Sequence, residues 1–169
     1  MLEALSPVDG RYRRHTESLS PWLSEHGLIR HRVEVEVEYF LALVDLGLPQ
    51  LEDFPASGPA SMRDMVERFS VEDSELVKST EATTNHDVKA VEYFVKDRME
   101  GIGLGAWKEF VHFGLTSQDV NNTAIPLSLK RATEHVLLPV MAELIATLAG
   151  RAKAWKDVPM LARTHGQPA

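Results

Sequence analysis

The sequence predicts an all-α fold, and three stretches of apolar residues at helical spacing support that prediction. In each stretch, apolar side chains recur every three or four residues, which places them on one face of an α-helix. The stretches are Ile29, Val33, Val37, Phe40, Leu41 and Val44; Val88, Val91, Val95 and Met99; and Leu137, Met141, Leu144 and Leu148. The last is typical of a long bundle helix. We expect an N-terminal helical domain over residues 1–110 and the start of a helical bundle over 111–169.

The segment before Gly47 is expected to hold an ordered loop followed by helices. Residues 1–19 are polar and rich in turn formers, which favours a loop. Ser20 and Pro21 are typical of a helix start, with serine as the cap and proline in the first turn. Residues 33–38 alternate Val and Glu as a strand would, but the wider spacing favours a helix over about 29–46.

Caps and breakers define the next elements. Residues 47–60 contain proline and glycine and are expected to form a loop. Ser61 then caps a short helix over 61–69. A further helix over 86–99 is expected to close at Gly101.

The long helix is expected to begin at Thr116 and to end near 157–159. Pro126 and Pro139 lie inside it, and each removes a backbone hydrogen bond, so kinks or a later start are expected. The last ten residues should be extended.

Composition narrows the class of protein. With 169 residues, 44% of them hydrophobic, the chain can bury one ordinary core. Its formal net charge of -7 repels a phosphate backbone, so no nucleic-acid binding is expected, although helix N-termini can still hold a small anion. The absence of cysteine excludes disulfides and thiolate zinc sites. Without an apolar run typical of a signal peptide or membrane span, we expect a cytoplasmic protein with no membrane partner.

Four polar clusters lie at the expected element boundaries, where side chains are free to meet a ligand. The first is Arg11-Tyr12, behind the turn Ser6–Gly10. A guanidinium binds a phosphate or carboxylate through two parallel hydrogen bonds, and the phenol adds one more. A solvated basic loop would have the same sequence, so both interpretations stay open.

The second cluster, residues 83–87, lies where the helix over 86–99 begins. Asn85 is expected to cap that helix, which is by itself a sufficient structural reason for its presence. His86 and Asp87 in the first turn would also face whatever ligand the helix N-terminus meets.

The third cluster precedes the long helix. Thr116 with Asp119 three residues later resembles a capping box, while the hydroxyls of Thr116 and Ser117 and the free N–H groups could equally hold a carboxylate. His112, between Phe110 and Phe113, is by itself typical of a core histidine.

The fourth cluster, Thr164-His165-Gly166-Gln167-Pro168, follows the long helix. His165 lies on an irregular segment, and an unperturbed histidine titrates near pH 6.5, so this side chain is suited to proton transfer. A lone loop histidine without function is the alternative.

In this order and spacing, the four clusters resemble the adenylosuccinate lyase family of the fumarase/aspartase superfamily. The resemblance covers essentially the whole chain and rests on four segments: Ser6 to Tyr12; Thr83 to Phe94; His112-Phe113 with Thr116 to Asp119; and Arg163 to Ala169. The first two segments favour this family over fumarase, aspartase and argininosuccinate lyase. The resemblance implies an N-terminal helical domain followed by the beginning of a fumarase/aspartase-type bundle.

The resemblance also implies a reaction. It is a β-elimination of purine nucleotide biosynthesis: fumarate leaves adenylosuccinate to give AMP, and leaves succinylaminoimidazole carboxamide ribotide to give the amine. His165 would be the general acid, and Arg11 and Tyr12 would hold the nucleotide phosphate. Asn85, His86 and Asp87 would bind the nucleotide and succinyl side, with His86 alternatively helping proton transfer.

Thr116 and Ser117 would bind a fumarate carboxylate. No metal and no cofactor is implied, and the full-length protein is expected to be a homotetramer.

One departure from the family concerns the base. The superfamily carries its base serine on a loop of the form Ser-Ser-x-Met-Pro-x-Lys-x-Asn-Pro, and this sequence contains no such stretch. We therefore expect a fragment that is inactive alone and whose exposed helix seam favours self-association. Two alternatives remain: another superfamily lyase, for example one acting on argininosuccinate, and a non-catalytic helical module.

Overall fold

The computed structural model describes residues 4–161 and 163–168. The chain divides into two compact units, residues 1–132 and 133–169, and each is described by itself. The domain boundary expected near residue 110 stays a prediction. The predicted all-α class is confirmed, and the strands described are the two of one short hairpin in the second unit.

The first unit begins with short helical turns, two of them inside residues 1–19, where the sequence predicts a loop, and the third at the predicted helix start at Ser20. Helix α1 spans Arg13–Thr16, the 3-10 turn η1 spans Glu17–Leu19 and helix α2 spans Ser20–Leu23. The proline lies in the first turn of α2 as expected, but the cap position is Leu19, so the prediction of Ser20 as the cap is wrong.

Helix α3, Glu25–Asp45, is the centre of the first unit and begins four residues before the predicted start. Ser24 caps it, because its side chain accepts a hydrogen bond from the Gly27 N–H. A Cβ at position 27 would lie 2.7 Å from the Trp22 carbonyl, so glycine lets α2 approach this turn. The helix stops before Gly47, whose φ is 76°.

The 3-10 turn η2, Pro49–Leu51, leads to helix α4, Gly58–Glu67. This helix begins three residues before Ser61, so the prediction that Ser61 caps it is wrong. Its cap position is Ser57, with Pro59 in the first turn, where a proline is well tolerated.

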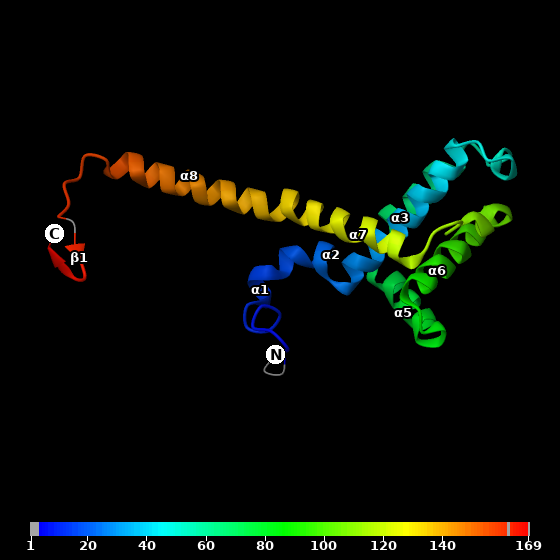
Figure 1. Cartoon of the computed structure of the whole chain (residues 1–169), viewed down its shortest axis with the longest axis horizontal. Helices are drawn as coiled ribbons and strands as arrows, with labels where there is room; N and C mark the ends of the chain where they lie inside the picture. Colours follow the sequence, from blue (N-terminus) through cyan, green and yellow to red (C-terminus); the bar gives the residue numbers. More distant parts are fainter. Residues whose placement is uncertain (1–3, 162, 169) are drawn as a thin grey trace. The chain divides into compact units, whose positions relative to one another are not determined.

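Helix α5, Val71–Thr84, has no counterpart in the prediction. It lacks a regular apolar stripe, and a capping box defines its start: the Ser70 hydroxyl accepts from the Asp73 N–H, and the Asp73 carboxylate accepts from the Ser70 N–H. Helix α6, Asp87–Gly101, follows as predicted. Figure 1 shows α5 and α6 side by side.

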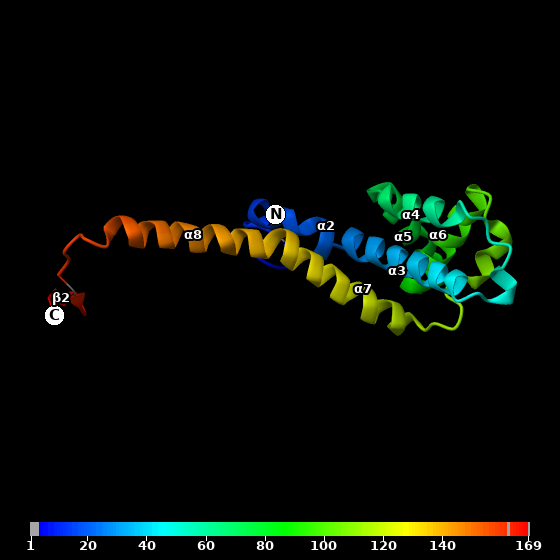
Figure 2. The same ribbon diagram turned by 90° about the horizontal axis from the view of Figure 1, so that it is seen from above.

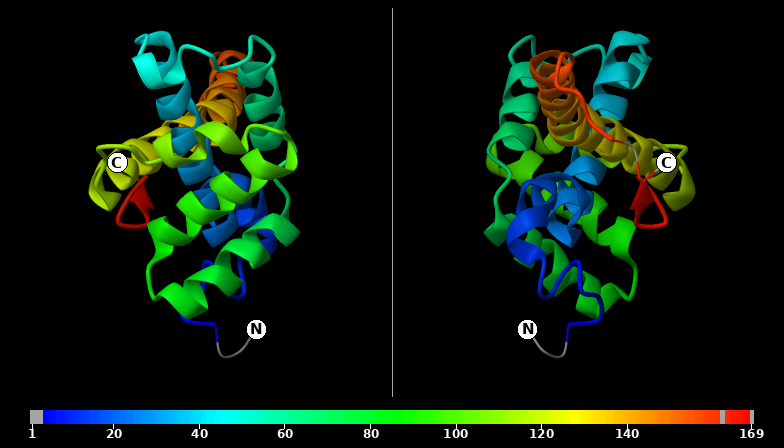
Figure 3. Two further views of the ribbon diagram at one scale, coloured as in Figure 1. Left: turned by 90° about the vertical axis from the view of Figure 1, so that its right-hand side faces the viewer. Right: turned by 90° about the vertical axis from the view of Figure 1, so that its left-hand side faces the viewer.

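The core of the first unit lies where α3 meets α4, α5 and α6 (Figure 2). It consists mainly of valines, phenylalanines and methionines from these helices, among them Val33, Val37, Phe40, Met62, Val77, Val91, Val95 and Met99. In the left view of Figure 3, the green helices α5 and α6 lie in front of α3. The apolar stripes that predict α3 and α6 are thus buried against each other.

The last helix of the unit is α7, Ser117–Ala132, which follows the 3-10 segment η3, Gly105–Phe110. It packs on α3 and α2 and is tied to them by polar contacts: Ser128 Oγ donates to the Trp22 carbonyl at 2.5 Å, and Arg131 pairs with Glu34. Pro126 lies inside α7, so it does not end the helix.

The second unit begins with a π-helical turn, Thr133–Leu137 (η4), followed by α8, Leu138–Trp155, with Pro139 in its first turn. No residue of α8 is buried. Strands β1, Arg163–Thr164, and β2, Gln167–Pro168, form an antiparallel hairpin. The continuous helical stretch Ser117–Trp155 is long and apolar enough to cross a membrane by length and composition, a test that core helices of soluble proteins also pass.

Candidate functional site

The site is built around the junction of α5 and α6. Asn85 ends α5 in the left-handed conformation, with φ of 52°, which asparagine tolerates better than most residues. The prediction that Asn85 caps α6 is therefore wrong. His86 takes that position, since its Nδ1 accepts a hydrogen bond from the Lys89 N–H at 3.0 Å.

The cap fixes the tautomer of His86. An Nδ1 that accepts from a backbone N–H carries no proton, so in the neutral ring the proton is on Nε2. That nitrogen lies 3.3 Å from Ser117 Oγ, in the first turn of α7. The second and third predicted clusters thus meet, and the N-termini of two helices come together at one point.

Both carboxylate oxygens of Asp87 have a bonding partner. Oδ1 accepts from the Val88 N–H at 2.8 Å, and Oδ2 pairs with Arg32 Nη2 at 2.7 Å. Partial burial works to raise the pKa of Asp87, but the Val88 N–H and the Arg32 charge outweigh it, so the pKa lies below its ordinary value. Asp87 is consequently a fixed anion at neutral pH.

A hollow of about 460 Å³ opens beside Asp87. Its lining consists of Lys78, Glu81, Ala82, Asn85 and Asp87. Lys78 is engaged with Glu25 and Glu81, so its charge is already balanced. Two of the predicted binding residues, Asn85 and Asp87, therefore border one open space.

The start of α7 contains the acidic half of the predicted capping box. The Asp119 carboxylate accepts from the Thr116 N–H at 2.7 Å and from the Thr116 hydroxyl at 2.8 Å. These two hydrogen bonds lower the pKa of Asp119. Thr116 is thus bound to Asp119, whereas Ser117 is in contact with His86.

The turn before α7 is held on α3 by two side chains. The Glu36 carboxyl group is fully buried, and its Oε1 is hydrogen-bonded to His112 Nδ1 at 2.5 Å. The Tyr39 hydroxyl donates to the Phe113 carbonyl at 2.8 Å. His112 has a φ of 63°. Burial raises the pKa of Glu36, and the hydrogen bond to His112 opposes that rise only in part. The expectation of a partnered core histidine agrees with this geometry.

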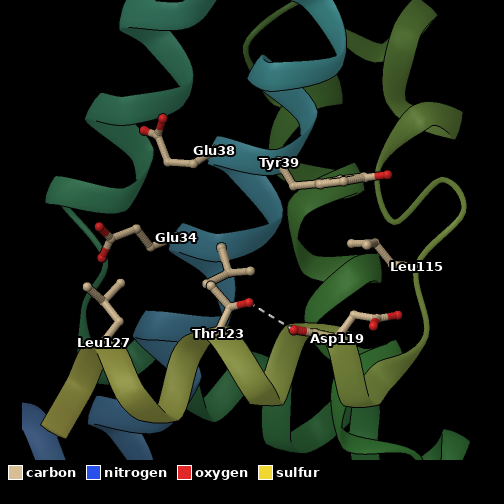
Figure 4. A pocket seen from close by; sticks show the side chains of 8 residues that line it. Glu34, Glu38, Tyr39, Leu115, Asp119, Thr123 and Leu127 are labelled. Atoms are coloured by element: carbon tan, nitrogen blue, oxygen red, sulfur yellow. Dashed lines mark hydrogen bonds between the residues drawn. The ribbon is translucent and has the colours of Figure 1, made fainter. Parts of the chain in front are cut away.

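A groove between α3 and α7 lies next to this turn (Figure 4). Its volume is about 330 Å³, and its lining consists of Glu34, Val35, Glu38, Tyr39, Leu115, Asp119, Thr123 and Leu127. The dashed line in Figure 4 is the bond from the Thr123 hydroxyl to the Asp119 carbonyl, an ordinary helical contact. His86 and Asp87 do not line this groove, whereas Asp119, which is bonded to Thr116, does.

Arg11 and Tyr12 lie on the N-terminal turn. Arg11 Nη2 donates to the Tyr12 hydroxyl at 2.7 Å, and the guanidinium lies 4.6 Å from the centre of the Tyr12 ring. Both contacts described for Arg11 are therefore with Tyr12, and both residues are exposed. The pair presents a cation and a hydroxyl to solvent, but the structure does not join it to His86 or Ser117.

His165 belongs to the second unit. It is exposed and occupies the turn of the β1–β2 hairpin with a φ of 51°, followed by Gly166 with a φ of 78°. Two consecutive positive φ values are those of a tight two-residue hairpin turn. Ala169, the last residue of the predicted motif, lies outside the described residues.

Within the part of the chain that the structure describes, no group of three or more His, Asp or Glu side chains could hold a metal ion. The expected absence of metal and cofactor stays a prediction.

Comparison with known proteins shows the family of the chain. The sequence profile of the family named Lyase matches residues 10–169. The chain belongs to the Lyase family. It is 47% identical to the adenylosuccinate lyase of Dictyostelium discoideum, 44% to that of Escherichia coli K12 and 40% to that of Legionella pneumophila strain Corby, over 99% of this chain in each case. The resemblance predicted from the four motifs is therefore confirmed.

The chain spans about 37% of the length of these relatives. The chain thus matches one portion of each of these relatives.

Sequence reasoning does not single out Arg32, Glu36 or Asn121. Arg32 and Glu36 are charged, but their helical spacing from the apolar stripe of α3 places them on its buried side. A charged residue at a predicted core position is the sequence feature that could have singled them out. Asn121 has no such signal, because its partner, Arg32, is 89 residues away in sequence.

Proposed function

We propose that this chain is the substrate-binding N-terminal portion of an adenylosuccinate lyase. The observation that carries the proposal is the meeting of His86 Nε2 and Ser117 Oγ, at 3.3 Å, where two helices begin. Helix N-termini favour anions, and the succinyl group of the substrate has two carboxylates. The relatives named adenylosuccinate lyase support the same assignment.

The proposed reaction is a β-elimination. A base removes a proton from the carbon beside a succinyl carboxylate, the C–N bond breaks, and its electron pair stays on the purine amine, which an acid protonates. Fumarate leaves, and the nucleotide product is AMP or, from the ribotide substrate, aminoimidazole carboxamide ribotide, whose carboxamide nitrogen takes the electron pair and the proton.

Each predicted site residue has a role in this reaction. Ser117 and Thr116, with the free N–H groups of α7, would stabilise the negative charge that develops on the carboxylate. Asn85, His86 and Asp87 would hold the nucleotide and succinyl side, and Arg11 with Tyr12 would hold the phosphate.

His165 would protonate the departing amine, a contribution of about 10²- to 10⁴-fold to the rate. The base is not assigned to any residue of this chain.

The exposed apolar face of α8 supports an assembly in which further helices cover it. We propose a cytoplasmic homotetramer for the full-length protein, acting on small purine nucleotides and not on nucleic acid.

The test is absorbance-monitored cleavage of adenylosuccinate by three proteins: a full-length protein that carries this sequence, its His165→Ala variant, and the 169-residue chain alone. We expect turnover by the first, a loss of about 10²-fold or more in the second, and none in the third. Cleavage of argininosuccinate instead would overturn the substrate assignment. Full activity of the variant would show that His165 is not the acid.

A further inference from the structure

Arg32 is a buried cation that connects three helices. It lies on α3 and is 6% exposed. Its Nη2 pairs with Asp87 Oδ2 on α6 at 2.7 Å, and its Nε donates to Asn121 Oδ1 on α7 at 2.9 Å. A buried charge is costly unless it is paired and hydrogen-bonded, so these two contacts are what make arginine tolerable at this position.

The two partners of Arg32 flank the His86–Ser117 contact. Asp87 is adjacent to His86 at the start of α6, and Asn121 lies four residues after Ser117 in α7. Both helices pack on α3, which is therefore their shared support. A planar guanidinium holds its donors in fixed directions, so one side chain sets the position of both helix starts.

We propose that Arg32 is a positioning residue for the substrate carboxylate: it holds the α6 and α7 N-termini so that His86 and Ser117 face the same ligand. Arg32 acts through Asp87 and Asn121 and does not touch the substrate. The expected change in KM rests on the proposed lyase function. The expected change in the distance between His86 and Ser117 does not depend on that function.

The kinetic test uses Arg32→Lys and Asn121→Ala in the full-length protein. Lysine keeps the charge but lacks the fork that reaches both helices, and alanine at 121 cuts only the link to α7. Because misplaced binding groups weaken substrate binding, KM for adenylosuccinate should rise and kcat/KM should fall about 10- to 100-fold. A change that merely destabilised the fold would reduce the amount of active enzyme and leave KM unchanged.

The matched control is Arg63→Lys. Arg63 also forms a bidentate pair with a residue of α3, Glu38, but both side chains are about half exposed, and neither lines the hollow beside Asp87. The KM and kcat of the Arg63→Lys variant should equal those of the unmodified protein.

A double-mutant cycle with Asp87→Asn tests the route of the effect. If Arg32 acts through Asp87, adding Arg32→Lys to Asp87→Asn lowers kcat/KM less than Arg32→Lys alone does. Fully additive losses, or an Arg32→Lys variant with unchanged KM, would overturn the proposal.

A crystal structure of the Arg32→Lys variant separates this proposal from the proposed function. The distance between His86 Nε2 and Ser117 Oγ should lengthen from 3.3 Å whether or not the protein cleaves adenylosuccinate. An unchanged distance would refute the role of Arg32, while absence of cleavage by the unmodified protein would refute only the lyase assignment.

Discussion

Helices α3 and α8 have the same spacing of apolar residues, but the apolar face of α3 is buried and that of α8 is exposed. In α3, Val33, Val37 and Phe40 are each 0% exposed, because α4, α5, α6 and α7 all pack on this helix. In α8, Met141 is 44% and Leu144 50% exposed. Periodicity therefore predicts that a helix forms and which face is apolar, but it does not reveal what covers that face.

The predicted site residues are also divided between the two regions. The first unit, with its own core, holds His86, Asp87, Thr116 and Ser117 in defined contacts. His165, on the hairpin after α8, belongs to a unit in which α8 has no buried residue. Each leucine covered on α8 would contribute about 1.5 to 3 kcal/mol, which is the driving force available for assembly.

The largest expected effect comes from truncating the same residue type in both regions. Met99 is 0% exposed in α6, so Met99→Ala should lower the free energy of unfolding by about 2 to 5 kcal/mol through lost burial and a cavity. Met141→Ala on α8 should change it by less than about 0.5 kcal/mol. Urea unfolding of the chain at a monomeric concentration measures both, and equal losses would break the comparison.

The buried pair of Glu36 and His112 predicts a pH-dependent effect. Because burial raises the pKa of Glu36 in the folded state, its contribution to stability is greatest below the ordinary carboxyl pKa and falls as pH rises through the folded pKa. His112→Ala removes the opposing hydrogen bond. The loss in free energy of unfolding should be about 3 kcal/mol at pH 8 and smaller at pH 5. Equal losses in urea unfolding at both pH values would contradict this account.

A smaller effect is expected at the helix caps. Ser70→Ala removes the capping hydrogen bond of α5 and should cost about 1 kcal/mol in the free energy of unfolding. Ser57→Ala is the matched control, since Ser57 occupies the cap position of α4 without a side-chain capping bond. Thermal unfolding of the two variants compares them directly, and an equal cost would remove the role given to the Ser70 hydroxyl.

The smallest effect is expected at the surface of α3. Glu38→Gln breaks the half-exposed pair with Arg63, and exposed ion pairs contribute little because solvent screens them. The urea midpoint should not change measurably, in contrast to His112→Ala, which removes the partner of Glu36 on the same helix. A large shift would mean that exposure does not distinguish the two pairs.

The sequence predicts the helices with a regular apolar stripe and the motifs that identify the family. It misses α5, because that helix has few apolar residues and is defined by the Ser70–Asp73 capping box. It also assigns the α6 cap to Asn85, since asparagine suits both a cap and a left-handed helix end, and only the fold decides between them.

Contacts between distant segments lie beyond sequence reasoning here. Ser117 and His86 are 31 residues apart, and Arg32 and Asn121 are 89 apart. Their meeting depends on how α6 and α7 pack on α3, which no local pattern encodes.

Hydrogen exchange of the 169-residue chain, compared with the full-length protein, tests the contrast between the two regions most directly. In the monomeric chain, the amides of α3 and α6 should be protected to nearly the full free energy of unfolding, while those of α8 should exchange far faster. In the full-length protein, α8 should become protected as further helices cover it. Strong protection of α8 in the monomeric chain would contradict the account.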